Sequence, residues 1–131
     1  MTESISHQIP GADAIIEWFG YWPDFHDGEI LELHLNRKGS SWIKIYTWSM
    51  TNKIDDKGYY ATEKHAIITF FFDKVTDVDF SDFSQQNVIN EMNISCSDNE
   101  IRLTMSPCYG LSGFLQGIVS RVELSPGEVE N

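Results

Sequence analysis

Several features that define common protein classes are missing from this sequence. The two cysteines, Cys96 and Cys108, are too few for a disulfide framework, and this favours a reduced, cytoplasmic setting. No apolar run reaches the roughly 18 residues that a membrane-spanning helix needs, so we expect no contact with a membrane. The opening MTESISHQIPGAD has neither a basic nor an apolar stretch, so we do not expect it to be a secretory signal peptide.

Motifs that carry chemistry are equally scarce. There is no HExxH, no CxxC and no glycine-rich phosphate loop. Ser112 lies in GLSG, which lacks the GxSxG pattern of a nucleophile elbow. We therefore expect no cofactor, no metal and no enzymatic activity. A weaker alternative is a metal or acid–base site built from His26, Asp27 and Glu29.

Positive charge is confined to the middle of the chain. Residues 1–36 hold seven acidic residues and no Lys or Arg, residues 37–74 hold seven basic and four acidic residues, and residues 75–131 hold nine acidic and two basic residues. The net charge of −11 argues against binding to nucleic acid, which requires a basic surface. It suits a basic protein partner, although acidity for the sake of solubility is the competing explanation.

Hydrophobic periodicity predicts one helix followed by strands. In residues 12–19 the apolar side chains Ala12, Ile15, Ile16 and Phe19 share one helical face. Gly11 or Asp13 is expected to cap the helix and Gly20 to end it. From Glu29 onwards the period changes to two, with Leu31, Leu33 and Leu35 facing inward.

Further strands are predicted over residues 42–50, 65–73, 92–97, 101–105 and 114–124. Residues 51–62 are expected to be a long polar connection, residues 74–87 an irregular segment with Val78, Phe80 and Phe83 tucked inward, and residues 107–113 a loop. Cys96 and Ile118 are expected to face inward, and Cys108 to lie in a loop.

These elements predict an α+β fold in which an N-terminal helix packs on a mostly antiparallel sheet of about six strands. Strand follows strand without intervening helices, which excludes a dinucleotide-binding fold. The length suits one domain over residues 1–131. We expect residues 1–9 and 126–131 to be frayed.

The segment WFGYWPDFHDGE, residues 18–29, combines five aromatic side chains with three carboxylates and no Lys or Arg. We interpret it as the hinge from helix to sheet. Phe19, Trp22 and Phe25 are expected to anchor it in the core, and Pro23 and Gly28 to set the turn. Hydrogen bonds from His26 and Asp24 or Asp27 should fix that turn.

Three segments resemble the immunity protein 50 family of bacterial polymorphic toxin systems. The first is WPDFHDGE at residues 22–29 and the second is FSQQN at residues 83–87. The third is YGLSG at residues 109–113, in which Tyr109, Gly110 and Gly113 carry the resemblance. Gly28 stands where the family pattern suggests a residue such as alanine. The resemblance covers residues 18–124 and implies a non-enzymatic protein that binds a cognate toxin and blocks it.

The acidic residues around these segments are the expected partner-binding side chains. They are Asp24, His26, Asp27, Glu29, Asp77, Asp79 and Asp82, with His26 included for its position. Because nuclease toxins are often basic, an acidic inhibitor suits such a partner by occlusion.

An aromatic stripe gives an alternative function. Trp42, Tyr46 and Trp48 share one face of a predicted strand with Lys44. We expect the N-terminal helix to cover this face, because its own apolar side must pack somewhere. Left open, the stripe would suit a small ligand or a carbohydrate that stacks on aromatic rings.

Overall fold

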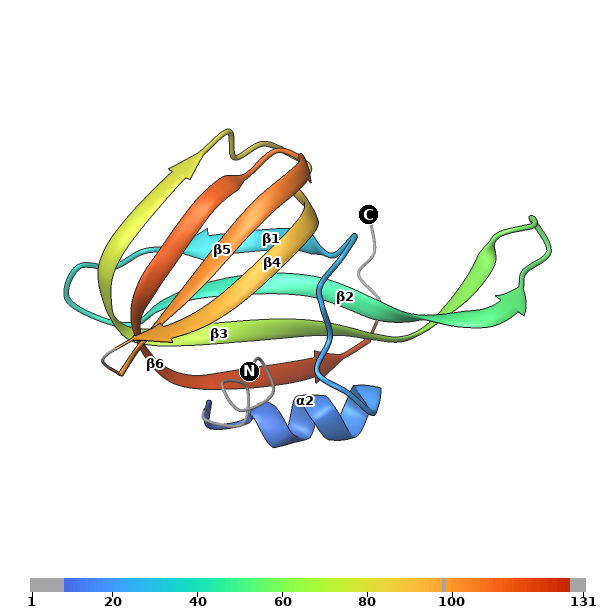
Figure 1. Cartoon of the computed structure of the whole chain (residues 1–131), viewed down its shortest axis with the longest axis horizontal. Coiled ribbons are helices and arrows are strands. Elements are labelled where there is room, and N and C mark those ends of the chain that lie inside the picture. Colours follow the sequence, from blue (N-terminus) through green and yellow to red (C-terminus); the bar gives the residue numbers. More distant parts are fainter. Residues whose placement is uncertain (1–8, 98, 128–131) are drawn as a thin grey trace.

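The computed structural model describes residues 9–97 and 99–127 (Figure 1). In this part of the chain one short helix, α2 (Ala12–Phe19), precedes six strands. The strands are β1 (Glu29–His34), β2 (Ser41–Ile54), β3 (Tyr60–Ser81), β4 (Val88–Ser97), β5 (Glu100–Tyr109) and β6 (Ser112–Pro126). All paired strands are antiparallel. The mostly antiparallel sheet of about six strands, with one helix, is therefore confirmed.

The six strands close into a barrel in the order β1-β2-β3-β6-β5-β4. Its longest wall is β3, whose 22 residues pair with β2 along one edge and β6 along the other. Register shifts lie between Phe71 and Asp77, where β3 curves from one side of the barrel to the other (Figure 1). Such bulges increase strand twist and allow a sheet to close.

Two glycines let β3 and β6 approach closely along this curve. A Cβ on Gly113 would lie 1.8 Å from the carbonyl oxygen of Asp79, and one on Gly117 would lie 2.0 Å from that of Lys74. Gly113 also has φ of 132°, which favours glycine. The sequence therefore uses glycine where the barrel bends.

The helix has the bounds expected from its periodicity. Gly11 is the N-cap without a side-chain hydrogen bond, and Gly20 (φ 85°) is the C-cap, whose N–H donates to the carbonyl of Ile16. Ala12, Ile15 and Phe19 are buried, whereas Ile16 is half-buried. No helix in the described residues is long and apolar enough to cross a membrane.

The helix lies against β6 and β3 (Figure 1). Its buried side chains join the barrel core, where Ile43, Ile45 and Phe70 are fully buried. Since Ile43 and Ile45 point inward, the alternate residues of β2 point out. The expectation that the helix covers Trp42, Tyr46 and Trp48 was therefore wrong.

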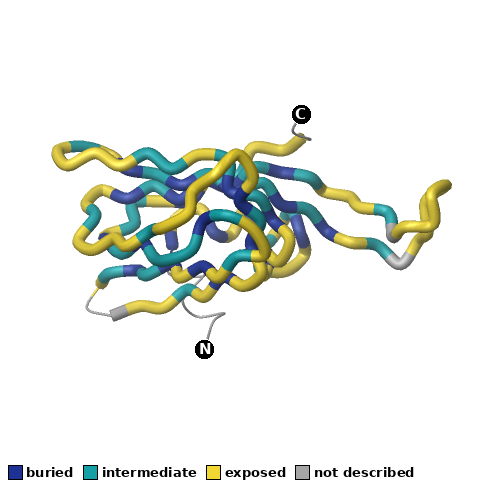
Figure 2. The backbone as a smooth tube through the Cα atoms, turned by 90° about the horizontal axis from the view of Figure 1, so that it is seen from above, coloured by how far each residue is buried: buried dark blue, intermediate teal, exposed yellow. Residues whose placement is uncertain are grey.

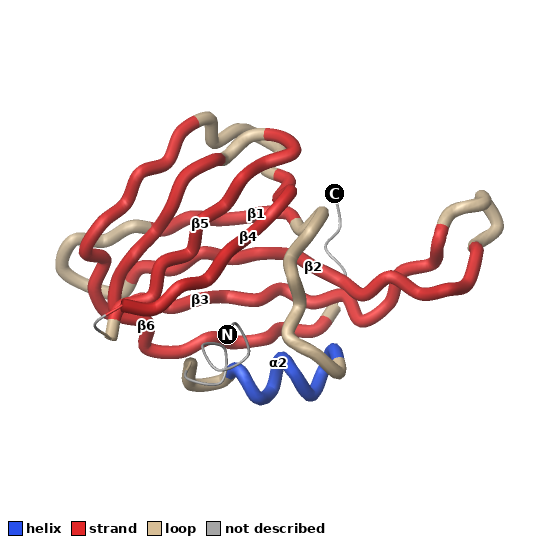
Figure 3. The backbone as a smooth tube through the Cα atoms, in the orientation of Figure 1, coloured by secondary structure: helices blue, strands red, loops and turns tan. Residues whose placement is uncertain are grey.

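The polar connection predicted over residues 51–62 is largely strand. β2 continues to Ile54 and β3 begins at Tyr60, so the two strands form an arm that projects beyond the barrel (Figure 3). Most of the arm is exposed (Figure 2), including Met50, Ile54 and Tyr59 at 57%, 58% and 70%. The prediction failed because both faces of this ribbon meet water, which removes the apolar alternation.

Two other predicted loops are also shorter than expected. β3 continues to Ser81, and Val78 and Phe83 are exposed, while Phe80 packs partly against the core as predicted. The expected loop at residues 107–113 reduces to a turn, because β5 ends at Tyr109 and β6 begins at Ser112.

Several side chains that were expected to face inward are not buried. Leu35, Ile118 and Cys96 are exposed. A register shift between Ile30 and Glu32 makes Ile30, rather than Leu31, the buried residue of β1. Cys108 is exposed as expected, although it lies in β5.

The predicted frayed ends fall mostly on residues 1–8 and 128–131, which lie outside the described part of the chain. Within it, Ile9 is buried and Pro126 pairs with Ala66 at the end of β6.

Candidate partner-binding surface

Residues 20–28 connect the helix to β1 through a turn anchored by aromatic side chains. Phe25 is 1% exposed although its φ is 63°, and Pro23 is buried beside it. The half-buried Trp22 ring meets Phe25 and Phe70 edge-on, at 6.0 and 6.2 Å between centroids. The predicted core role of Phe25 is confirmed, and Trp22 packs at the edge of the core.

His26 fixes this turn from outside. Its backbone N–H donates to Asp24 Oδ1 at 2.9 Å, and its ring Nδ1 lies 2.6 Å from the carbonyl oxygen of Asn90 on β4. Its Nε2 lies 3.6 Å from Asp27 Oδ1. The Asn90 carbonyl, and then the carboxylates of Asp27 and Asp24, raise the pKa of the exposed His26 imidazole above 6.5.

The barrel closes where the turn enters β1. Glu29 pairs with Val88, the one residue pair that joins β1 to β4 in the described structure. Around it, Asp27 N–H donates to the carbonyl of Ile89, and Ile89 N–H donates to that of Gly28, both at 2.8 Å. The main chain therefore closes the barrel here, and the carboxylates of Asp27 and Glu29 are not part of that ladder.

The buried side chain of Asn87 supports this closure of the barrel. Its side chain is 2% exposed, and its Oδ1 accepts hydrogen bonds from the N–H groups of Ser84 and Leu111. Its Nδ2 donates to the carbonyl of Ser84, and its own carbonyl accepts from Ile30 N–H. Gly110 (φ 78°) leaves room for it, since a Cβ there would lie 2.5 Å from Asn87 Oδ1.

The three segments singled out in the sequence therefore meet in space. Residues 22–29, 83–87 and 109–113 are far apart in the chain, but Asn87 bonds Ile30, directly after the first segment, and Leu111 in the third. We name this meeting point the junction: Asp27 to Ile30, Ser84 to Ile89, and Tyr109 to Leu111. In the sequence, only the family resemblance grouped these three segments. Hydrogen bonds from a side chain to backbone groups produce no periodic pattern of apolar residues that could have revealed the contact.

The predicted acidic residues fall into two groups. Asp24, His26, Asp27 and Glu29 border the seam between β1 and β4. Asp77 and Asp79 lie on β3, paired with Gln116 and Phe114 of β6, and their side chains are exposed. Asp82 (φ 65°) follows the end of β3, in the connection that leads to Asn87.

One cation lies beside the β3 group. Arg102 lies 3.9 Å from Asp77, donates to Gln116 Oε1 at 2.7 Å, and stacks over the Phe114 ring at 4.0 Å. The outer wall at Asp77 therefore carries a balanced pair of charges. The seam group has no Lys or Arg among residues 9–36 or along β4.

The aromatic stripe on the outer face of β2 is half-exposed. His34 stacks on Trp42 at 3.9 Å between centroids, and Tyr46 lies 5.2 Å from Trp48. Trp42 Nε1–H donates to Glu32 Oε2 at 2.5 Å. That hydrogen bond, and then the charge of Lys44, lower the pKa of the Glu32 carboxyl below its usual value.

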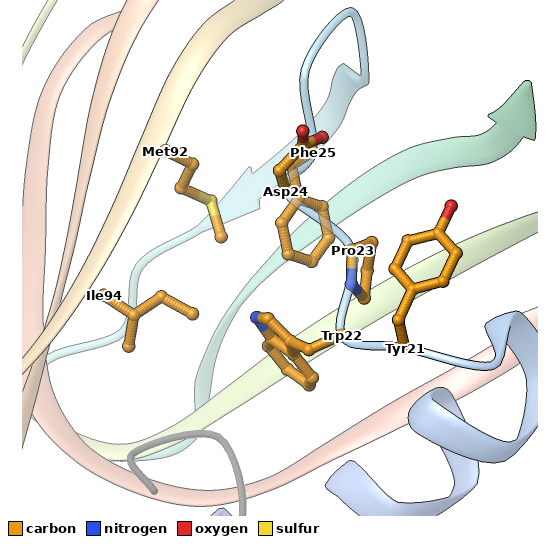
Figure 4. Close-up of a pocket in the computed structure, with 7 residues that line it drawn as sticks. All are labelled: Tyr21, Trp22, Pro23, Asp24, Phe25, Met92 and Ile94. Carbon is orange, nitrogen blue, oxygen red and sulfur yellow. The ribbon is translucent and has the colours of Figure 1, made fainter. Parts of the chain in front are cut away.

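A cavity of about 310 Å³ opens beside the seam group (Figure 4). One wall is the turn and the other is β4, whose Met92 and Ile94 point toward the turn in Figure 4. The cavity is lined by Tyr21, Trp22, Pro23, Asp24, Phe25, Met92 and Ile94. The lining is mostly apolar, with one carboxylate at its edge.

The geometry around His26 does not assemble a metal site. Among the described residues, no group of three or more His, Cys, Asp or Glu side chains is placed to hold an ion. His26 instead uses its ring and backbone to bind Asn90 and Asp24, as expected for a residue that locks a turn.

Comparison with protein families identifies the class as that of immunity proteins. The family model described as Immunity protein 50 matches residues 11–113, which include the helix, the turn, the junction and β1 to β5. The chain belongs to the immunity protein 50 family, as its three segments suggested. Searches of curated proteins and of solved structures found no significant match.

Proposed function

We propose that this protein binds a cognate bacterial toxin domain and neutralises it by occlusion, without catalysis. The family match over residues 11–113 carries this proposal. Immunity proteins act by holding a partner, which agrees with the lack of a catalytic motif in the sequence. The protein would act in the cytoplasm of the cell that makes the toxin.

The charge supports a basic partner. A net charge of −11 creates a field that attracts cationic surfaces and speeds encounter. Nucleases carry such surfaces because they bind phosphate. We therefore favour a basic nuclease domain as the toxin.

The contact surface we propose is formed by the acidic residues described above. Asp24, His26, Asp27 and Glu29 border the seam, and Asp77, Asp79 and Asp82 add exposed carboxylates along β3 and at its end, with Arg102 beside Asp77. All except the half-buried Glu29 are exposed. Exposure matters because these groups are available to a partner without rearrangement of the core.

The decisive experiment uses the toxin domain encoded beside this gene. Co-expression is expected to protect cells from that toxin, and the purified proteins are expected to bind with a dissociation constant below about 1 μM. A neighbouring gene product that is not a toxin, or one that does not bind, contradicts the proposal.

A second candidate is carbohydrate or small-ligand binding by the stripe of Trp42, Tyr46 and Trp48. One observation favours it: the helix packs elsewhere, so these rings remain half-exposed on the outer face. Titration with soluble oligosaccharides, followed by tryptophan fluorescence, tests it, with Trp48→Ala as the variant that should lose the signal. An unchanged spectrum removes this candidate.

A further inference from the structure

A second cavity lies along the same strand as the cavity beside the turn. Met92, Ile94 and Cys96 alternate along β4 and pair with the buried residues Met105, Leu103 and Ile101 of β5, so all three lie on its inner face. Met92 and Ile94 line the first cavity. The second cavity, of about 260 Å³, is lined by Ile9, Cys96, Asn99, Ile101 and Val119. The two cavities therefore follow the same face of one strand, and we call them together the β4 groove.

Among the described residues, one backbone edge of β4 has no strand partner along this groove. β5 pairs with one edge of the strand up to Ser97. On the other edge, Val88 pairs with Glu29, Ile89 bonds the turn, and the carbonyl of Asn90 meets the His26 ring. Among the described residues, no strand pairs with residues 91–96 on this edge. An unpaired strand edge can accept an added strand from another chain.

Carboxylates border the groove, with His26 beside Asp27 as a titratable base among them. Asp24 lies at its rim, with Asp27 in the same turn, and Glu91 is exposed on β4. Residues 9–36 and 88–100 contain no Lys or Arg. An apolar slot with an acidic border is complementary to a segment that carries both apolar and basic side chains.

From these three observations we propose that the β4 groove is the anchor site for the partner, and that its occupant is an extended basic segment of the toxin domain. An apolar side chain of that segment enters the cavity between Trp22 and Ile94. Its backbone pairs with the open edge of β4, and its Lys or Arg side chains meet Asp24 and Asp27. This inference rests on the proposed function, because the partner is the toxin.

Filling the cavity tests the anchor directly. Ile94→Trp places a larger side chain in the cavity, so affinity for the neighbouring toxin domain is expected to fall at least about 30-fold, as at an interface hot spot. Thr104→Trp is the matched control, because Thr104 is exposed on the outer face of β5. It should bind within about threefold of the wild type.

Removing charge at the groove tests the basic segment. Asp24→Asn combined with Asp27→Asn keeps the acceptor for His26 N–H and suits the left-handed backbone at Asp27. Asp77→Asn with Asp79→Asn removes the same charge from β3. Both pairs should slow association through the weaker field, whereas the groove pair should also speed dissociation by about tenfold, more than the β3 pair does.

Cys96 provides a readout that does not depend on a variant in the first cavity. In a Cys108→Ser background, Cys96 is the remaining thiol, and it is exposed in the second cavity. Its reaction with a maleimide is expected to slow at least about tenfold when the toxin domain is bound, as thiol reactivity depends on access.

The outcomes separate the two proposals. If wild-type protein binds the toxin but Ile94→Trp binds equally well, or Cys96 stays reactive in the complex, the groove is not the anchor and the proposed function still stands. If the wild type does not bind the toxin, the proposed function fails and this inference fails with it. If Ile94→Trp does not fold, the paired Asp→Asn variants and the Cys96 measurement decide.

Discussion

Among single residues, Asn87 links the largest number of chain segments at the junction. One buried amide bonds Ser84 and Leu111, and the Asn87 carbonyl receives Ile30 N–H from β1. No buried side-chain polar atom in the described residues lacks a partner. Loss of this amide would leave the backbone N–H groups of Ser84 and Leu111 without their acceptor, and Leu111 is buried away from water.

We therefore expect Asn87→Ala to lower the free energy of unfolding by about 2–4 kcal/mol. Chemical denaturation followed by tryptophan fluorescence measures it. Gln85→Ala, at an exposed position of the same connection, is the control and should change stability by less than about 0.5 kcal/mol. Equal effects of the two substitutions would contradict the role assigned to Asn87.

His26 gives a second residue-scale prediction, on pH. Its pKa is raised above 6.5, chiefly by the Asn90 carbonyl. Folding therefore favours the protonated ring: this contribution to stability is fully present below pH 6.5 and is lost as pH rises through the folded-state pKa. An NMR titration of the ring protons should show a midpoint above 6.5.

Asp27→Asn separates the causes of that shift. Because Asn90 contributes more than Asp27, the variant should lower the His26 midpoint only in part, leaving it above 6.5. A midpoint at or below 6.5 in the wild type would show that the hydrogen bond to Asn90 is absent in solution.

At the scale of elements, the arm formed by β2 and β3 stands apart from the barrel. The described hydrogen bonds of residues 51–61 stay within this segment, as in the bonds from Thr51 to Ala61 and from Lys57 to Asp55. Isolated two-stranded ribbons are marginally stable in water. The arm is thus expected to open without disturbing the core.

Replacing residues 51–61 with Asn-Gly joins Met50 to Thr62, which already pair, through a two-residue turn. We expect the free energy of unfolding to change by less than about 1 kcal/mol, because the segment buries little surface. Differential scanning calorimetry measures it. A loss of several kcal/mol would mean that the arm supports the barrel.

Elements were predictable where the pattern is local. Residues 12–19 repeat apolar side chains at helical spacing. Along β5, Ile101, Leu103 and Met105 alternate with polar residues, and all three are buried. The arm escaped prediction because both of its faces are solvated, and the second half of β3 escaped because register shifts interrupt its alternation. Cys96 was misassigned because alternation gives a side chain's direction but not whether anything covers it.

The site was predictable only in part, for a related reason. Asp24, His26 and Asp27 stand out as a dense run of polar groups, but the cavity beside them needs Met92 and Ile94 from β4. Barrel closure brings these strands together through the pairing of Glu29 with Val88, and pairing between such distant residues leaves no trace in a single sequence.

At the scale of the whole molecule, charge is the dominant property. With 20 acidic and 9 basic residues, the protein should attract a basic toxin from beyond contact distance. Raising NaCl from about 0.05 to 0.5 M is expected to slow association at least about tenfold while changing dissociation little. Surface plasmon resonance separates the two rates, and association that is independent of salt would contradict a basic partner.

The junction also has a consequence for how such a protein can diversify. The barrel is closed by main-chain hydrogen bonds and by the buried amide of Asn87, whereas the carboxylates of Asp24 and Asp27 stand outside that framework. Side chains at the rim of the groove can therefore be exchanged at little cost to the fold. One scaffold can then be matched to a new toxin by changing its border alone, in step with changes in that toxin.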